Sequence, residues 1–308
     1  MIKNAFIFPG QGSQYVGMGK DLYESYPQIK DLYKKANDIM GLDLATISFE
    51  GPEEKLKQTQ ITQPAIFVNS IAVFEIVKDV LPTPSAVAGH SLGEYSALVA
   101  AGSLSFEDGL SVVKIRGELM QKAGTDKPGT MGAIIGLGAD VINEICQSLE
   151  SVGIVCAANF NSPGQIVISG DVKAVRQAME AAKEKGAKRA VELVVSGAFH
   201  SPLMEGAAEG LAEALNKAEI KDARVPVYTN VQAAPAIENS EIKDLLFRQL
   251  THPVRWEEII INMSSDRVGE FYELGPGKVL TGLNKRINKE LLSTAIGTLS
   301  EIESLKNV

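Results

Sequence analysis

The segment Gly89-His90-Ser91-Leu92-Gly93 constrains the fold more than any other part of the chain. The small and β-branched residues 85–88 before it predict a short buried strand, and the Ala-rich residues 94–101 after it predict a buried helix. Gly-x-Ser-x-Gly at a sharp turn from strand to helix is the pattern of a nucleophile elbow. We therefore expect Ser91 at the tip of the turn, close to backbone N–H groups that can stabilise an oxyanion. The alternative is a glycine-rich turn that happens to contain a serine.

Composition excludes several classes of protein. The net charge of −8 argues against a nucleic-acid partner. Two cysteines are too few for a disulfide framework or a cysteine metal site, so we expect a reducing, cytoplasmic setting and no metal. The first apolar run ends at Pro9, which is too short for a secretory signal, and no uninterrupted apolar window reaches the length of a membrane span.

The order of expected elements predicts an α/β protein with two domains. A strand over 4–8 and helices over 21–40, 61–80 and 105–123 precede a polar turn at 125–129. A β-α-β-β-α-β pattern follows, which is typical of a ferredoxin-like unit. Its expected strands are 131–135, 154–158, 165–169 and 189–193, and its expected helices are 140–149 and 171–185. We predict a large α/β-hydrolase-like domain, residues 1–126 and 197–308, with a small ferredoxin-like domain, residues 127–196, inserted in it. In the last part of the chain we expect a helix over 241–250, a strand over 268–274 and a final helix ending near Ile287.

Arg116 lies within an apolar helical stripe. It is three or four residues from Val112, Val113, Leu119 and Met120, which should form the buried face of its helix. Burying a guanidinium without a counter-charge costs several kcal/mol. Either its aliphatic stem carries the charge out to water, or the charge points into a pocket and holds a carboxylate. The helix alone does not decide between these.

Other residues are weaker candidates. The loop that contains Gln11 follows the first strand, and its glycines can bring a backbone N–H beside a reaction centre, although the loop alone favours a structural turn. Asn159 and Asn161 either face the cleft between the two domains or shape a turn.

His200 lies in a small-residue turn and is the best available general base for Ser91, since His90 should point away and His252 lies in a loop. No acid stands out between Ser91 and His200, so a neutral acceptor is expected to orient the imidazole.

Several separated segments together resemble the malonyl-CoA:acyl carrier protein transacylase family over nearly the whole chain. They are Phe8-Pro-Gly-Gln-Gly-Ser-Gln14, Gly89-His-Ser-Leu-Gly-Glu94, Arg116, Gly197-Ala-Phe-His200, Gln249 before Thr251-His-Pro-Val-Arg-Trp256, and Glu273-Leu-Gly-Pro-Gly277.

The resemblance implies a role for each candidate. Ser91 is the nucleophile that takes the malonyl group from malonyl-CoA as an ester, and His200 is its general base. The backbone carbonyl of Gln249 holds the imidazole, and the N–H groups of Gln11 and Leu92 form the oxyanion hole. Arg116 binds the free carboxylate of the malonyl group. Phe199 selects malonyl over methylmalonyl. Asn159 and Asn161 are expected to contact substrate.

The resemblance also implies a ping-pong cycle. The acceptor is the phosphopantetheine thiol of acyl carrier protein, and the product supplies fatty acid biosynthesis. The reaction needs no cofactor. We expect a monomer without a nucleic-acid or membrane partner. Because carrier proteins are acidic, docking is expected at one of two basic clusters: Lys185, Lys188 and Arg189, or Lys285, Arg286 and Lys289.

Two other classes of function stay open from the sequence. A serine thioesterase or esterase of the α/β-hydrolase type shares the elbow, but it expects an acid partner for the histidine and does not need Arg116. The second alternative is a non-catalytic scaffold that binds a carrier protein. The presence of Ser91, His200 and Arg116 argues against it.

Overall fold

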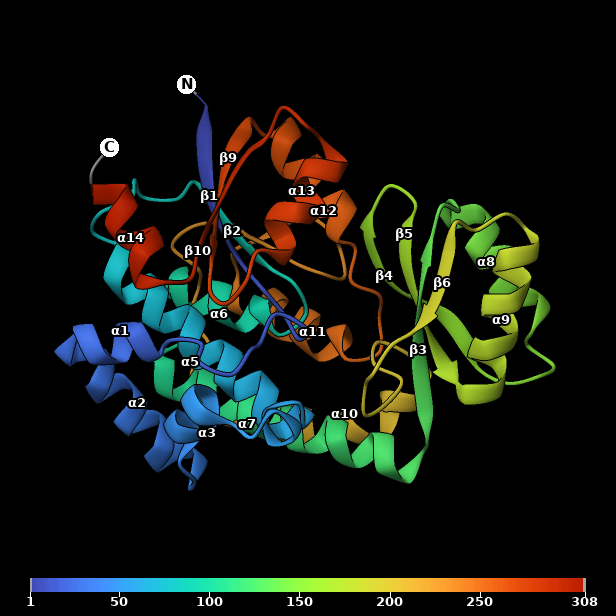
Figure 1. Cartoon of the computed structure of the whole chain (residues 1–308), viewed down its shortest axis with the longest axis horizontal. Helices are drawn as coiled ribbons and strands as arrows, with labels where there is room; N and C mark the ends of the chain where they lie inside the picture. The colour runs from blue at the N-terminus through green and yellow to red at the C-terminus, as the bar shows by residue number, and fades with distance from the viewer. Residues whose placement is uncertain (1, 307–308) are drawn as a thin grey trace.

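A computed structural model describes residues 2–306 and shows an α/β protein with two sheets (Figure 1). The larger sheet has the strand order β10-β9-β1-β2-β7-β8, and all its neighbouring pairs are parallel except β7 with β8. Its strands are β1 (Lys3–Phe8), β2 (Ala86–Gly89), β7 (Val227–Tyr228), β8 (Pro235–Ala236), β9 (Val268–Leu274) and β10 (Leu292–Ile296).

Both faces of the larger sheet are buried, which explains why its central strands are apolar throughout rather than alternating. In β1, Phe6 and Phe8 face one core, and Ala5 and Ile7 face another. Helices α5 (Thr59–Val77), α6 (Gly93–Ala100) and α7 (Phe106–Asp126) pack in the first core, and α12 (Trp256–Ser265) and α13 (Val279–Ile287) pack in the second. The helices outside the smaller unit are α1 (Lys20–Ser25), α2 (Pro27–Met40), α3 (Leu44–Glu50), α4 (Glu53–Leu56), α5 (Thr59–Val77), α6 (Gly93–Ala100), α7 (Phe106–Asp126), the 3-10 helix η1 (Pro202–Ala207), α10 (Ala208–Lys217), α11 (Asn239–Gln249), α12 (Trp256–Ser265), α13 (Val279–Ile287) and α14 (Leu299–Lys306).

Helix α5 is the one helix within residues 2–306 that is long and apolar enough to cross a membrane by length and composition alone. In the structure, 83% of its apolar window is buried inside the protein. Its side chains pack in the first core, so α5 is explained as a core helix.

The smaller sheet has the order β4-β5-β3-β6, and all its neighbouring pairs are antiparallel. Its elements are β3 (Gly129–Ile135), α8 (Ala139–Ser148), β4 (Val155–Ser162), β5 (Gln165–Asp171), α9 (Val172–Glu184) and β6 (Arg189–Glu192). Helices α8 and α9 cover one face of this sheet, as Figure 1 shows at its right-hand side. On the other face, Met131 and Val167 pack with residues of the first core, so this face of the smaller sheet contacts the larger unit.

Three expectations about the elements need correction. Strand β4 continues to Ser162, because its pairing with β5 extends to Ser162 opposite Gln165. Asn161 is therefore in a strand and not in a turn. Helix α7 runs to Asp126, into the segment expected to be a turn. The helix ending at Ile287 is not the last element, because β10 and α14 follow it; the exposed positions of β10 hid its pairing with β9.

Parallel pairing of β1 and β2 positions the site. Their register sets Phe8 opposite Gly89, so the loop after β1 and the turn after β2 leave the sheet side by side at the carboxyl ends of the strands. In open α/β sheets this end of the strands is where ligands bind.

Candidate active site

The turn at Ser91 is a strained elbow. Ser91 has φ 52°, in the left-handed region that residues other than glycine seldom adopt. A Cβ on Gly93 would lie 2.1 Å from the Phe8 carbonyl oxygen, and one on Gly10 would lie 2.3 Å from the His90 carbonyl oxygen. Glycine at these two positions therefore allows the β1 loop and the elbow to touch.

Ser91 and His200 form a hydrogen-bonded pair. Ser91 Oγ lies 2.8 Å from His200 Nε2. The Nδ1 atom of His200 lies 2.9 Å from the Gln249 carbonyl oxygen and 3.1 Å from the His252 carbonyl oxygen. An Nδ1–H that donates to a carbonyl leaves Nε2 free to accept the serine proton, so two neutral acceptors take the place that an acid has in a Ser-His-Asp arrangement.

The environment keeps the imidazole of His200 neutral. Its burial, followed by the positive charge of Arg116, lowers its pKa to about 3. A neutral imidazole is the form that can accept a proton from Ser91.

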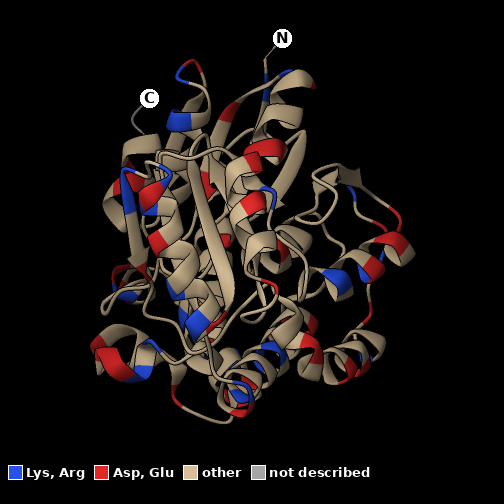
Figure 2. Ribbon diagram, turned by 90° about the vertical axis from the view of Figure 1, so that its right-hand side faces the viewer, with Lys and Arg blue, Asp and Glu red and all other residues tan. Residues whose placement is uncertain are grey.

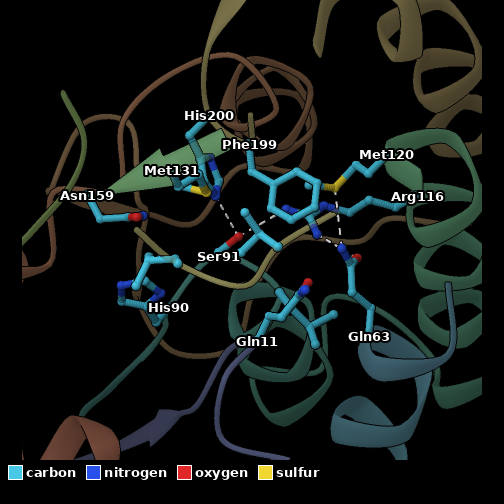
Figure 3. A pocket seen from close by; sticks show the side chains of 13 residues that line it. Gln11, Gln63, His90, Ser91, Arg116, Met120, Met131, Asn159, Phe199 and His200 are labelled. Carbon is cyan, nitrogen blue, oxygen red and sulfur yellow. Dashed lines mark hydrogen bonds between the residues drawn. The ribbon is translucent and has the colours of Figure 1, made fainter. Parts of the chain in front are cut away.

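Arg116 points into the site from α7, opposite His200 (Figure 3). Its side chain is buried, and the Nη2 atom donates to Ser91 Oγ at 3.1 Å and to the Gln249 side-chain oxygen at 3.0 Å. Nη1 donates to Gln63 Oε1 at 2.6 Å. Burial lowers the pKa of the guanidinium, and among the described residues no carboxylate forms a hydrogen bond or ion pair with it. The alternative in which its charge reaches water is wrong, since only 1% of Arg116 is exposed.

Gln11 and Leu92 lie at the same pocket as Ser91. The two residues line one small cavity with Ser91, and neither backbone N–H donates a hydrogen bond to another described residue. The N–H of Ser91 itself is occupied, because it donates to Asn230 Oδ1 at 2.6 Å. The arrangement can therefore offer two free donors to a developing oxyanion.

The cavity above Ser91 encloses about 110 Å³ and suits a small acyl group. Phe199 and Asn159 line it. Asn161 does not line it, and its Oδ1 lies 2.8 Å from His90 Nε2. His90 turns towards Asn161 and also lines the cavity, so it faces the pocket although it was expected to point elsewhere. The full lining is Gln11, Gln63, His90, Ser91, Leu92, Arg116, Met120, Met131, Asn159, Leu193, Val195, Phe199 and His200.

Comparison with known proteins identifies the family. Residues 5–301 match the model of the acyl transferase domain family. The chain is 49% identical over 304 residues to malonyl CoA-acyl carrier protein transacylase of Bacillus subtilis, covering 98% of this chain and 96% of the relative. The chain belongs to the malonyl CoA-acyl carrier protein transacylase family.

Solved structures agree with this assignment. The acyl carrier protein S-malonyltransferase of Vibrio cholerae is 44% identical, with a TM-score of 0.94 over 98% of this chain and 99% of that one. A malonyl-transacylase solved in complex with a holo acyl carrier protein of a type II polyketide synthase is 42% identical, with a TM-score of 0.95 over 99% of this chain and 100% of that one.

Three polar residues of this transacylase site were missed in the sequence. Gln63 lies in the apolar helix α5, Glu94 follows the elbow, and Asn230 lies in the loop after β7. All three are buried and hydrogen-bonded to site residues. A signal existed for Gln63 and Glu94, because each is a polar residue within a buried apolar helix, as Arg116 is. Asn230 gave none, since asparagine is common in loops.

Proposed function

We propose that this chain transfers the malonyl group of malonyl-CoA to the phosphopantetheine thiol of acyl carrier protein through a malonyl-Ser91 ester. The observation that carries the proposal is the position of Ser91 Oγ, which is held by the general-base candidate His200 on one side and by the cationic Arg116 on the other. A hydrolase needs the first contact only. The second matches a substrate with a free carboxylate.

The first half-reaction forms the ester. Ser91 Oγ attacks the thioester carbonyl carbon of malonyl-CoA while its proton passes to His200 Nε2. The carbonyl oxygen becomes an oxyanion that the N–H groups of Gln11 and Leu92 can stabilise, at roughly 3–4 kcal/mol for a donor of this kind. When the carbon–sulfur bond breaks, the leaving thiolate takes the proton from His200 and CoA departs as the thiol.

The second half-reaction repeats these steps with another thiol. The thiol of the carrier protein gives its proton to His200 and its sulfur attacks the ester carbonyl carbon. The bond from that carbon to Ser91 Oγ breaks, and the serine oxygen recovers a proton from His200. Thiol and thioester are exchanged without net oxidation, so the same residues serve both halves of a ping-pong cycle.

Arg116 supplies selectivity. The malonyl carboxylate would accept hydrogen bonds from its guanidinium and neutralise its charge, whereas an acetyl group would leave a buried cation unpaired. We place Phe199 and Asn159 in the wall of the acyl pocket, since both line it. Asn161 would act indirectly, by holding His90.

The finer description of the fold belongs to the same proposal. We assign residues 1–126 and 197–308 to an α/β-hydrolase-like domain and residues 127–196 to a ferredoxin-like domain. The second assignment is supported by the strand order β4-β5-β3-β6, which a ferredoxin-like unit has. We further place the protein in the cytoplasm, in fatty acid biosynthesis and as a monomer.

Intact mass of the purified protein tests the proposal. Addition of malonyl-CoA alone should add one malonyl group to the wild-type protein and none to Ser91→Ala. Addition of holo acyl carrier protein should remove that mass and place it on the carrier. Rapid release of free malonate with no lasting adduct would favour a hydrolase, and no adduct or turnover at all would favour a binding scaffold.

A further inference from the structure

Glu94 is a buried carboxylate with no part in the steps above. It lies in the first turn of α6, three residues after Ser91, and only 2% of it is exposed. One carboxylate oxygen, Oε2, accepts from Gln249 Nε2 at 3.0 Å and from the backbone N–H of Asn230 at 2.9 Å. A buried acid is costly unless its hydrogen bonds are needed, so its position calls for an explanation.

Its hydrogen bond fixes which way the amide of Gln249 faces. The Nε2 of Gln249 donates to Glu94 and also to the Ser91 carbonyl oxygen at 3.0 Å. The Oε1 of the same amide is therefore left to accept from Arg116 Nη2 at 3.0 Å. A flipped amide would present its NH2 group to a guanidinium and its oxygen to a carboxylate, and both contacts would be unfavourable.

The neutral amide of Gln249 between Glu94 and Arg116 has a consequence for substrate binding. A direct pair between Glu94 and Arg116 would occupy the guanidinium with a carboxylate of the protein itself. With Gln249 between them, Arg116 is oriented by a neutral oxygen and keeps its charge available for the carboxylate of a substrate. Glu94 thus helps to orient Arg116 without pairing with the guanidinium itself.

We propose that Glu94 is a positioning residue that fixes the side-chain amide of Gln249 and, through that amide, the guanidinium of Arg116, so that the site prefers an acyl group with a free carboxylate. This inference rests on the proposed malonyl transfer. Glu94 also reaches the elbow through Asn230, whose side chain accepts from Ser91 N–H and donates to the Gly89 carbonyl at 2.6 Å each. The contact with Gln249 carries selectivity, and the contact with Asn230 steadies the elbow.

The experiment compares self-acylation of Ser91 by malonyl-CoA and by acetyl-CoA in Glu94 variants. Glu94→Ala should lower the malonyl-to-acetyl ratio of kcat/KM at least tenfold, mainly by raising KM for malonyl-CoA. Glu94→Gln should stay within about threefold of wild type, because its amide oxygen can accept the same two hydrogen bonds. An equal loss for both substrates in Glu94→Ala would indicate a merely structural role and overturn the proposal.

A double-mutant cycle tests whether Glu94 acts through Gln249. In a Gln249→Ala background, which keeps the backbone carbonyl, Glu94→Ala should change the ratio less than twofold. An undiminished tenfold change in that background would overturn the proposal. If Glu94→Ala does not fold, Glu94→Asp replaces it: the shorter side chain withdraws the acceptor, and at least a fivefold fall in the ratio is expected, with an unchanged ratio counting against the proposal.

Glu273→Ala is the matched control. Glu273 is also a buried glutamate, and it accepts backbone N–H bonds from Leu280 and Thr281 at the start of α13. Its loss should lower stability and leave the malonyl-to-acetyl ratio unchanged. The wild-type protein distinguishes failure of the proposed function from failure of the positioning role. No malonyl adduct on wild-type Ser91 would contradict the proposed function. A normal wild-type adduct with an unchanged malonyl-to-acetyl ratio in Glu94→Ala would contradict the positioning role alone.

Discussion

Arg116 Nη2 donates a hydrogen bond at 3.1 Å to the same Ser91 oxygen that lies 2.8 Å from His200. A cation at this position does two things before any substrate arrives. It favours negative charge on the serine oxygen, and it disfavours a positive charge on the imidazole, whose pKa it helps to lower. The residue proposed to bind substrate is thus also part of the electrostatics of the proposed nucleophile and base.

Ser91→Ala should abolish acyl-enzyme formation, because no other group at the elbow can form the ester. His200→Ala should slow self-malonylation by at least about a thousandfold, since loss of the base in a serine–histidine unit is of that order or larger. Rapid-quench measurement of the malonyl adduct checks both. His252→Ala is the matched control, because its imidazole is exposed and only its backbone carbonyl contacts His200. A labelled Ser91→Ala protein would show that the nucleophile is another residue.

Arg116→Ala should remove the preference for malonyl over acetyl groups. The lost contact is a buried, charge-assisted pair, for which about 2–5 kcal/mol is typical, or roughly 30-fold to several thousandfold in kcat/KM for malonyl-CoA. Use of acetyl-CoA should fall much less, because it loses the effect of the cation on Ser91 and His200 but no carboxylate contact. Arg116→Lys keeps the charge but not the planar guanidinium, so its preference for malonyl over acetyl should lie between those of wild type and Arg116→Ala. The ratio of specificity constants for the two thioesters decides, and an unchanged ratio in Arg116→Ala would rule out the clamp.

The same substitution should raise the pKa of His200. Burial is the larger cause of its low value, about 3, and the positive charge of Arg116 is the next. Removing that charge makes the imidazolium less unfavourable, so the acid limb of Ser91 reactivity should move to higher pH. The rate of inactivation by phenylmethanesulfonyl fluoride, followed from pH 3 to 8 so that the range reaches the wild-type value, measures this with a reagent that carries no carboxylate. A limb that stays in place or moves to lower pH would contradict the assigned electrostatics.

Much of the fold could be predicted from the sequence because its signals are local. Ser105 caps α7 by accepting from the Asp108 N–H, as the Ser-x-x-Asp pattern predicts, and the strand over 268–274 is found at those residues. The order of elements in 127–196 was also predicted, since the apolar period changes at each element. Element β10 was missed because its side chains are largely exposed, and its pairing with β9 depends on residues about twenty positions away.

The candidate site could be predicted only where a residue conflicts with its surroundings. Arg116 stands out because a charge within an apolar stripe is costly without a partner. The Gln249 side chain does not stand out, because a glutamine near a helix end is ordinary, and its hydrogen-bond partners come from α7, α6 and the elbow. Networks of this kind depend on long-range packing, which no short segment of sequence encodes.

Carrier-protein docking should depend on one of the two basic clusters. Lys185, Lys188 and Arg189 are exposed around β6, and Lys285, Arg286 and Lys289 are exposed at the end of α13, where Arg286 contacts Gln165 of the smaller sheet. Figure 2 shows acidic and basic residues interspersed along the ribbon, so charge alone does not single out a face.

Reversing the three charges of the cluster that docks the carrier should raise KM for carrier protein at least about fivefold at low salt, and the effect should shrink as salt screens the charges. Self-malonylation by malonyl-CoA should be unchanged in the same variant, because that half-reaction does not involve the carrier. Steady-state kinetics with each triple reversal checks this. An unchanged KM in both reversals would place docking elsewhere.

Glu94 should make the protein less stable as the solution passes from mildly acidic to neutral pH. Burial raises the pKa of its carboxyl from 4.5 to about 7, against weaker lowering by Gln249, Asn230 and Arg116. Between these values the unfolded chain gives up the proton and the folded chain keeps it, so stability present below pH 4.5 is lost as pH rises through 7, by an amount on the order of 3 kcal/mol. His200 changes stability in the opposite direction below its unfolded pKa, but it does so equally in wild type and in a Glu94 variant.

Glu94→Gln should therefore gain stability relative to wild type on going from pH 4.5 to pH 7.5, whatever the difference in stability between the two proteins at pH 4.5. Urea unfolding gives the free energy of unfolding of both proteins at each pH. The difference between variant and wild type is then compared at the two pH values, and the contribution of His200 cancels in this comparison. Glu213→Gln, at an exposed position of α10, is the control and should show the same offset from wild type at both pH values. A Glu94→Gln protein whose offset is also independent of pH would mean that the carboxyl is already ionised in the folded protein at pH 4.5 to 7, held so by the N–H groups and the guanidinium around it.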